Sequence, residues 1–312
     1  MHCFMNWDNA PIAMARVTAC TVWLSIPWRP SVNNKFLRLF SLCIVVMSLL
    51  SAGVSAQQSA AQQFFGHNAA VAKVQPTWFT PVMQADPRLV QYYRFSFSNE
   101  FGSTKTQTTN YGNGRGGGVI GWNRFEFDVV PAPFIQHNSA TTDGAGDTSL
   151  LVKARLLSSP SDKGNYILTA IGSHSFATGT ALNGARTDTW TATLAGGKGL
   201  GKKTVVESTL GGTLPTGKIA AQGRSIAWSS LVGYHATPHT WLELEDNATY
   251  YVGGPHDGKM QNFITPAAFY ILRKKAWKPT HPFFIFDCGM QMATSGFHTY
   301  NHNLLPEMRI LF

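Results

Sequence analysis

Acidic and basic side chains occupy alternate positions in two nearby segments of the chain. Glu126 and Asp128 are separated by one residue, and so are Lys153 and Arg155. If both segments are strands, each pair lies on one face, because side chains two residues apart in a strand point the same way. Opposite charges on neighbouring strands form cross-strand ion pairs or line a polar path for a solute. The sequence leaves both interpretations open.

The same alternation places more charged residues on the face that the apolar residues avoid. Tyr93, Phe95 and Phe97 alternate with polar residues, and so do Phe125 and Phe127. If these apolar residues face lipid, their charged neighbours must face an interior. The residues expected to line that interior are Arg94, Arg124, Glu126, Asp128, Lys153, Arg155, Glu207, Glu243 and Glu245.

Other candidate chemistry is weaker. The segment 212–218 resembles the start of a phosphate-binding loop, but Ile219 follows where Ser or Thr must hold magnesium. His235 and His239 have the spacing of a helical metal pair, yet a Thr-Pro turn separates them. We therefore predict no catalytic residue, no metal site, no cofactor and no enzymatic activity. His174 near Ser173 and Ser175 is the one loose candidate for a lipid-modifying barrel enzyme.

The elements that would position the charged residues are strands. Charged residues make up 13% of the chain, against an average of about 25%. The 29 glycines disfavour a helical bundle. From residue 89 onward, apolar and polar residues alternate in about twelve segments of roughly 9 to 12 residues, a length that crosses a bilayer when tilted. The connections are alternately short and long, as in outer-membrane barrels.

These observations predict an all-β fold. We expect an antiparallel transmembrane β-barrel of about twelve strands, with short periplasmic turns and longer extracellular loops. The chain ends on a strand whose alternate residues are Met308, Ile310 and Phe312, which we interpret as the C-terminal signal for the barrel-assembly machinery.

The N-terminal region indicates export. Residues 32–56 combine Lys35 and Arg38, an apolar run and the small residues before Gln57, which is the pattern of a cleaved signal peptide. Residues 1–31 are then an extension ahead of the true translation start. Residues 57–88 form an N-terminal lead, and residues 89–312 form the barrel. The aromatic residues Phe64, Phe65, Trp78 and Phe79 make this lead either a plug or a disordered periplasmic tail.

Three motifs carry a resemblance to a known family. They are FEFDVVP at 125–131, DGAGDTSLLVKARLL at 143–157 and GTLPTGK at 212–218. Over residues 89–312 the chain is similar to the family named for the MetA pathway of phenol degradation. The resemblance implies an outer-membrane barrel thought to act as a channel for small hydrophobic or aromatic molecules.

The predicted function is passive uptake or efflux of such molecules across the outer membrane of a Gram-negative bacterium. The expected partners are outer-membrane lipid and lipopolysaccharide, the assembly machinery and a small hydrophobic solute, with no nucleic acid. We expect a monomer. Two alternatives remain open, namely a lipid-modifying barrel enzyme and a secreted, soluble β-sheet protein that binds a ligand.

Overall fold

A computed structural model describes residues 60–112, 114, 116–180, 182–272 and 282–312. The predicted extension 1–31 and the signal peptide 32–56 lie outside the described residues. Within the described part, no helix is long and apolar enough to cross a membrane.

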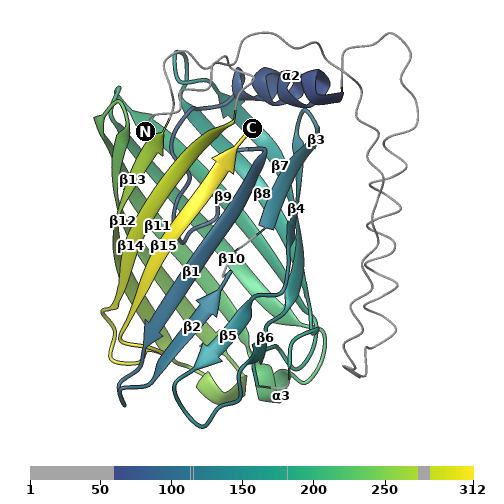
Figure 1. Ribbon diagram of the computed structural model, residues 1–312, viewed down its shortest axis with the longest axis vertical. Helices are drawn as coiled ribbons and strands as arrows, with labels where there is room; N and C mark the ends of the chain where they lie inside the picture. Colours follow the sequence, from purple (N-terminus) through teal and green to yellow (C-terminus); the bar gives the residue numbers. More distant parts are fainter. Residues whose placement is uncertain (1–59, 113, 115, 181, 273–281) are drawn as a thin grey trace, which may run out of the picture. The chain divides into compact units, whose positions relative to one another are not determined.

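Fifteen β segments form one antiparallel sheet that closes through pairing of β1 with β15 (Figure 1). Three pairs of segments continue one another across short breaks, namely β2 with β3, β4 with β5, and β6 with β7. Counting each pair once leaves twelve strands, so the predicted barrel is confirmed. The segments are β1 (Tyr92–Phe101), β2 (Gln107–Tyr111), β3 (Gly116–Trp122), β4 (Phe125–Val130), β5 (Phe134–His137), β6 (Gly144–Ala145), β7 (Thr148–Ser159), β8 (Tyr166–Phe176), β9 (Thr189–Leu200), β10 (Thr204–Pro215), β11 (Arg224–Thr237), β12 (Thr240–Val252), β13 (Met260–Leu272), β14 (Phe283–Ala293) and β15 (His302–Leu311).

The two ends of the barrel differ in their connections. At one end, which we call the terminal rim, lie Phe312, helix α2 (Ala60–Ala72) and, among the described connections, the short turns 123–124, 160–165, 201–203 and 238–239. At the opposite end, the loop rim, the connections are longer on average, and they carry helix α3 (Ile219–Gln222) and the 3₁₀ turn η1 (Gly254–His256). The predicted division into short turns and longer loops is therefore confirmed.

The strands form because alternate residues satisfy two different surroundings. Phe127 and Val152 point outward and are 36% and 40% exposed, whereas Glu126 between the aromatic residues of β4 is fully buried inside the barrel. Leu210, Val232 and Phe286 continue the apolar outer face on other strands. A closed sheet with an apolar outside is the arrangement that satisfies every strand hydrogen bond within a bilayer.

One outward row departs from this pattern. Gly196, Ser208, Ser230 and Asp246 are directly opposed on four successive strands, from β9 to β12. They form the floor of a shallow groove, and the Asp246 carboxylate accepts a hydrogen bond at 2.8 Å from Asn262 Nδ2. The outer face is thus apolar with a narrow strip of small and polar residues.

The hydrophobic core lies inside the barrel. The chain between α2 and β1, residues 73–91, passes into the terminal-rim half of the interior, and we call it the inserted segment (Figure 1). Its Trp78, Phe79 and Val82 pack against inward residues of the wall. The Phe79 ring lies 5.0 Å from the ring of Trp241 and 4.9 Å from that of Phe269.

The breaks between paired segments lie side by side in the wall. Gly112 and Gly114 separate β2 from β3 at φ angles of 98° and 68°, which L-residues with side chains rarely adopt. Pro131 and Pro133 lie between β4 and β5, where a proline cannot donate a ladder hydrogen bond. A Cβ on Gly116 would lie 2.1 Å from the carbonyl oxygen of Val129, so β3 can approach β4 here only as glycine.

We predict that Gly116→Ala destabilises the barrel by about 1–3 kcal/mol, because the backbone of β4 must move to admit the methyl group. A folded barrel is expected to migrate faster on an SDS gel than the unfolded chain. The temperature at which heating converts the folded band to the unfolded band should fall. Gly172→Ala is the matched control, since nothing lies within 4 Å of its Cβ position in β8. Equal transition temperatures for the two variants would contradict the close approach.

Candidate functional site

Carboxylates of the barrel wall bind backbone amides of the inserted segment. Glu245 on β12 accepts hydrogen bonds from Met83 N at 2.9 Å and from Gln84 N at 3.0 Å. Glu243 accepts one from Val82 N at 3.3 Å. Glu207 on β10 accepts another from the side-chain Nε2 of Gln84 at 3.1 Å. These three acids were predicted to face the interior, and the structure brings them together on the inserted segment.

Arginines on β15 and β1, three and four strands from β12, bind the carbonyls of the same stretch. Arg309 on β15 donates to Thr80 O at 2.5 Å and to Pro81 O at 2.7 Å. Arg94 on β1 donates to Val82 O at 2.9 Å. Both guanidinium groups also pair with Glu307, so each arginine links the wall and the segment. Arg309 and Glu307 were not among the predicted site residues.

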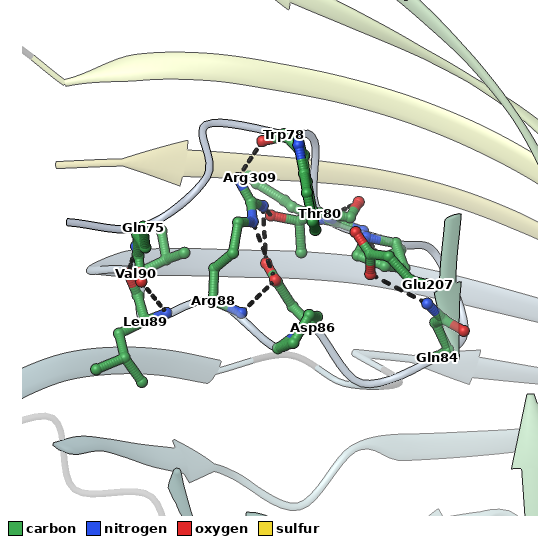
Figure 2. Close-up of polar contacts among 12 residues, drawn as sticks. Gln75, Trp78, Thr80, Gln84, Asp86, Arg88, Leu89, Val90, Glu207 and Arg309 are labelled. Atoms are coloured by element: carbon green, nitrogen blue, oxygen red, sulfur yellow. Dashed lines mark hydrogen bonds and ion pairs between the residues drawn. The ribbon is translucent and has the colours of Figure 1, made fainter. Parts of the chain in front are cut away.

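The inserted segment is folded back on itself by its own ion pair (Figure 2). Asp86 accepts two hydrogen bonds from the Arg88 side chain, at 3.1 and 2.8 Å, and Arg88 also donates to Trp78 O and to Thr80 Oγ1. Burial alone would raise the pKa of Asp86, but the positive charges of Arg88 and Lys153 outweigh it and lower the pKa below its usual value. The pair is therefore charged although it is buried.

The return of the segment to β1 is fixed by a second group of contacts. The side chain of Gln75 pairs with both backbone groups of Leu89, at 2.7 and 3.1 Å (Figure 2). Glu126 accepts a hydrogen bond from Val90 N and forms an ion pair with Lys153 at 2.7 Å. The interior carboxylate and lysine thus serve as a cross-strand pair and also as a contact to the segment.

The remaining predicted interior residues have different surroundings. Asp128 accepts a hydrogen bond from Tyr92 Oη at 3.2 Å. Arg155 donates to Asn123 O at 2.6 Å, to Gln75 Oε1 at 3.2 Å and to Val71 O at 3.4 Å, at the terminal rim. The structure therefore places Arg155 beside the helix and the inserted segment, away from Asp128.

The prediction for Arg124 is wrong. Arg124 lies in the two-residue turn between β3 and β4 and is exposed, so it does not line the interior. The prediction assumes that the alternation of β4 includes Arg124, but β4 begins at Phe125. The side chain of a turn residue need not point inward.

The four aromatic residues of the predicted plug separate into two pairs. Trp78 and Phe79 are buried inside the barrel, and Trp78 Nε1 donates to Asn165 Oδ1 at 2.9 Å. Phe64 and Phe65 lie on α2 at the terminal rim, with ring centroids 5.8 and 6.4 Å from that of Phe312. The last residue of the predicted assembly signal thus packs on α2, while Met308 and Ile310 are on the outward face of β15.

Sequence reasoning missed an apolar part of the interior. Near the terminal rim, inward positions of six strands carry buried hydrophobic side chains that surround the inserted segment. They are Ile167, Val205, Leu231, Trp241, Phe269 and Ile285. The sequence does indicate this apolar region, because apolar residues are consecutive at these strand ends, as in Phe269-Tyr270-Ile271-Leu272. Consecutive apolar residues in a strand indicate that both of its faces are in apolar surroundings.

The loose catalytic candidate does not assemble. Ser173 and His174 are adjacent in β8 and therefore point to opposite faces of the sheet. The ring of His174 packs 4.2 Å from the ring of Trp190, and its Nε2 lies 3.4 Å from Asp188. In the described part of the chain, no three His, Cys, Asp or Glu side chains are arranged to hold a metal ion.

The interior retains space beside the inserted segment. A cavity of about 1190 Å³ opens at the terminal rim between α2, the segment and the turns. A smaller one of about 120 Å³ lies deeper and is lined by Asp86, Asp128, Lys153 and Arg309. The interior beside the segment therefore contains a small cavity with charged groups in its lining and a wide vestibule at the terminal rim.

Comparison with known proteins gives structural matches only. No family model and no curated protein matches the sequence. The fold is similar to an outer membrane channel from Pseudomonas putida F1, at 17% identity and a TM-score of 0.48, covering 72% of this chain and 94% of that one. It is also similar to the NanC porin, at 9% identity and a TM-score of 0.45 over 71% and 98% of the chains. The corresponding values for the KdgM porin are 9%, 0.41, 70% and 99%.

We predict that Glu245→Ala frees the inserted segment locally. Loss of hydrogen bonds to a buried carboxylate should cost about 1.5–3 kcal/mol, so the amides of Met83 and Gln84 should exchange hydrogen roughly 10 to 150 times faster. Hydrogen exchange read by mass spectrometry measures this directly. Asp246→Ala is the control, because Asp246 faces outward on the same strand. Unchanged exchange in Glu245→Ala would show that the carboxylate does not hold the segment.

Proposed function

We propose that the protein is a gated channel for passive movement of small hydrophobic or aromatic molecules across the outer membrane of a Gram-negative bacterium. The observation that carries the proposal is a closed barrel with an apolar outside, whose terminal-rim half holds a segment of its own chain through polar contacts. A scaffold that only anchored another domain would not need a removable filling.

The membrane assignment rests on the outer surface. Large apolar side chains such as Leu210, Val232 and Leu244 are each more than half exposed on the outward face. In water such a surface would drive aggregation, whereas in a bilayer it contacts lipid. This favours an embedded barrel over the alternative of a secreted, soluble protein. The terminal rim then faces the periplasm, and the loop rim faces outward.

The solute class rests on the interior surface. With the inserted segment in place, the open space is bordered by the aromatic rings of Trp78, Phe79 and Trp241, by aliphatic side chains and by polar residues of the rim turns, and most of its lining surface is apolar. Such a surface favours apolar or aromatic solutes over sugars, which need closely spaced polar partners. The resemblance to the MetA-pathway family agrees with this class, and we propose membership of that family.

The mode of opening follows from the contacts of the segment. The wall holds the backbone of residues 80–84 by hydrogen bonds that water can replace, and the segment continues directly into β1 at Tyr92. Displacement toward the periplasm would open the interior while the barrel remained closed. No nucleotide is required, so the concentration gradient drives movement.

We propose that the barrel acts as a monomer that is surrounded by lipid and lipopolysaccharide and is assembled by the outer-membrane machinery.

We predict that Leu244→Arg impairs insertion. A charge near the middle of β12 on the lipid face should cost about 2–4 kcal/mol. Recovery of heat-modifiable protein in the outer-membrane fraction should fall. Ala140→Arg, in an exposed connection of the loop rim, is the matched control and should insert normally. Normal insertion of both variants would argue against lipid contact at Leu244.

The channel itself is tested by flux. We expect full-length protein in liposomes to admit phenol in preference to glucose, and Glu245→Ala to show raised ion conductance in planar bilayers because its segment is held less firmly. Asp246→Ala should behave like the wild type.

Two single substitutions separate the channel from a barrel enzyme. Ser173→Ala and His174→Ala should leave flux unchanged, whereas an enzyme that used either residue would lose activity. If neither the wild type nor Glu245→Ala passes any solute or ion, the channel function is wrong.

A further inference from the structure

The large cavity at the terminal rim has two chemically distinct parts. Its floor and inner wall are apolar, and its outer border is basic. The side chains that form the apolar part are Phe79, Trp241, Ile271, Ile285 and Leu311. The Trp241 ring is held in a fixed orientation between the His235 ring, stacked at 4.4 Å, and the Phe79 ring at 5.0 Å.

The basic border comes from three lysines. Lys73 follows α2, and Lys202 with Lys203 forms the turn between β9 and β10. All three are exposed and none forms an ion pair within the described part of the chain, but Lys203 Nζ lies 5.9 Å from the ring centroid of Tyr234, which is on the outward face of β11. Asp162 is the one acidic residue that lines this cavity among the described residues. The cavity therefore carries an excess of positive charge at its mouth.

The other charged group at the cavity is already neutralised. Arg88 lines the inner end, but its guanidinium group is taken by Asp86, Thr80 and the carbonyl of Trp78. The acidic wall residues that bind residues 82–84 do not line this cavity. A ligand in the vestibule thus meets lysine ammonium groups on one side and aromatic rings on the other.

We propose that the vestibule binds an amphipathic organic anion, namely an aromatic or medium-chain aliphatic carboxylate. The hydrocarbon part would lie on the partly buried side chains of Ile271 and Phe283, and the carboxylate would lie at Lys202, with Lys203 turning in from the Tyr234 ring. This inference rests on the proposed channel function and deepens it, because it names the class of solute that the periplasmic mouth receives. A cavity of about 1190 Å³ has room for such a ligand.

Binding is measured with a brominated probe, because bromine quenches tryptophan fluorescence on contact. Full-length protein in amphipol is titrated with 8-bromooctanoate, and then with 8-bromooctanol and 8-bromooctylamine, which have the same chain and a different head. We expect the carboxylate to bind roughly tenfold more tightly than the alcohol. The amine should bind more weakly than the alcohol, and added salt should reduce the preference for the carboxylate.

The double variant Lys202→Glu/Lys203→Glu should lose the preference for the carboxylate. Lys163→Glu is the matched control, because Lys163 is an exposed lysine in a neighbouring turn that does not line the cavity. Heat-modifiable migration on SDS gels verifies that each variant is folded. Trp241→Phe should reduce the quenching and so locate the probe.

Three results would overturn the proposal: no quenching by any probe, equal affinity for the three heads, or a carboxylate preference that survives in the double variant. The outcome is independent of transport. Solute flux with no carboxylate binding would reject this inference and leave the channel intact. Carboxylate binding without any flux would reject the channel function and leave the binding site.

Discussion

The structure depends on one requirement, which is that a non-helical backbone buried inside a barrel must find hydrogen-bond partners. Residues 80–84 belong to neither a helix nor a strand, so no ladder serves them. An unpaired buried amide or carbonyl costs about 1–3 kcal/mol. The wall supplies the partners with charged side chains. Carboxylates on β12 accept hydrogen bonds from the backbone amides, and guanidinium groups on β1 and β15 donate to the carbonyls. The interior therefore carries acidic groups where the amides of residues 80–84 point and basic groups where their carbonyls point.

The same requirement explains why the interior charges are unevenly placed. Glu243 and Glu245 lie on β12, and Arg309 and Arg94 lie on the adjacent strands β15 and β1, three and four strands away around the barrel. With the inserted segment between them, each group contacts a backbone dipole of opposite sign. Glu307 and Asp287 balance the arginines from the same side of the wall, so the cluster remains close to neutral.

The barrel could be predicted from the sequence because the residues of its outer face form the same alternating apolar pattern in most strands. Every second residue is apolar, as from Tyr93 to Phe97, because the outer face contacts lipid along its whole length. Short turns between long strands complete the pattern. The interior has no uniform surrounding. Whether Glu126 meets Lys153, a solute or the amide of Val90 depends on residues brought together from distant parts of the chain. Arg309 was missed for this reason, since nothing near it in the sequence indicates the carbonyls of Thr80 and Pro81.

In the proposed gate, the aromatic contacts would hold the segment in the barrel more strongly than the charged contacts do. Water can replace the hydrogen bonds of residues 80–84 if the segment leaves, so their net contribution is modest. Burial of Phe79 against Trp241 and Phe269 has no such replacement, and each buried large side chain stabilises the closed state by about 1.5–3 kcal/mol. Trp241 also lines the vestibule. A hydrophobic ligand that bound this ring only when Phe79 had moved away would favour the open state by its difference in affinity for the two states. The ring that holds the segment is thus also the place where a solute could act on it.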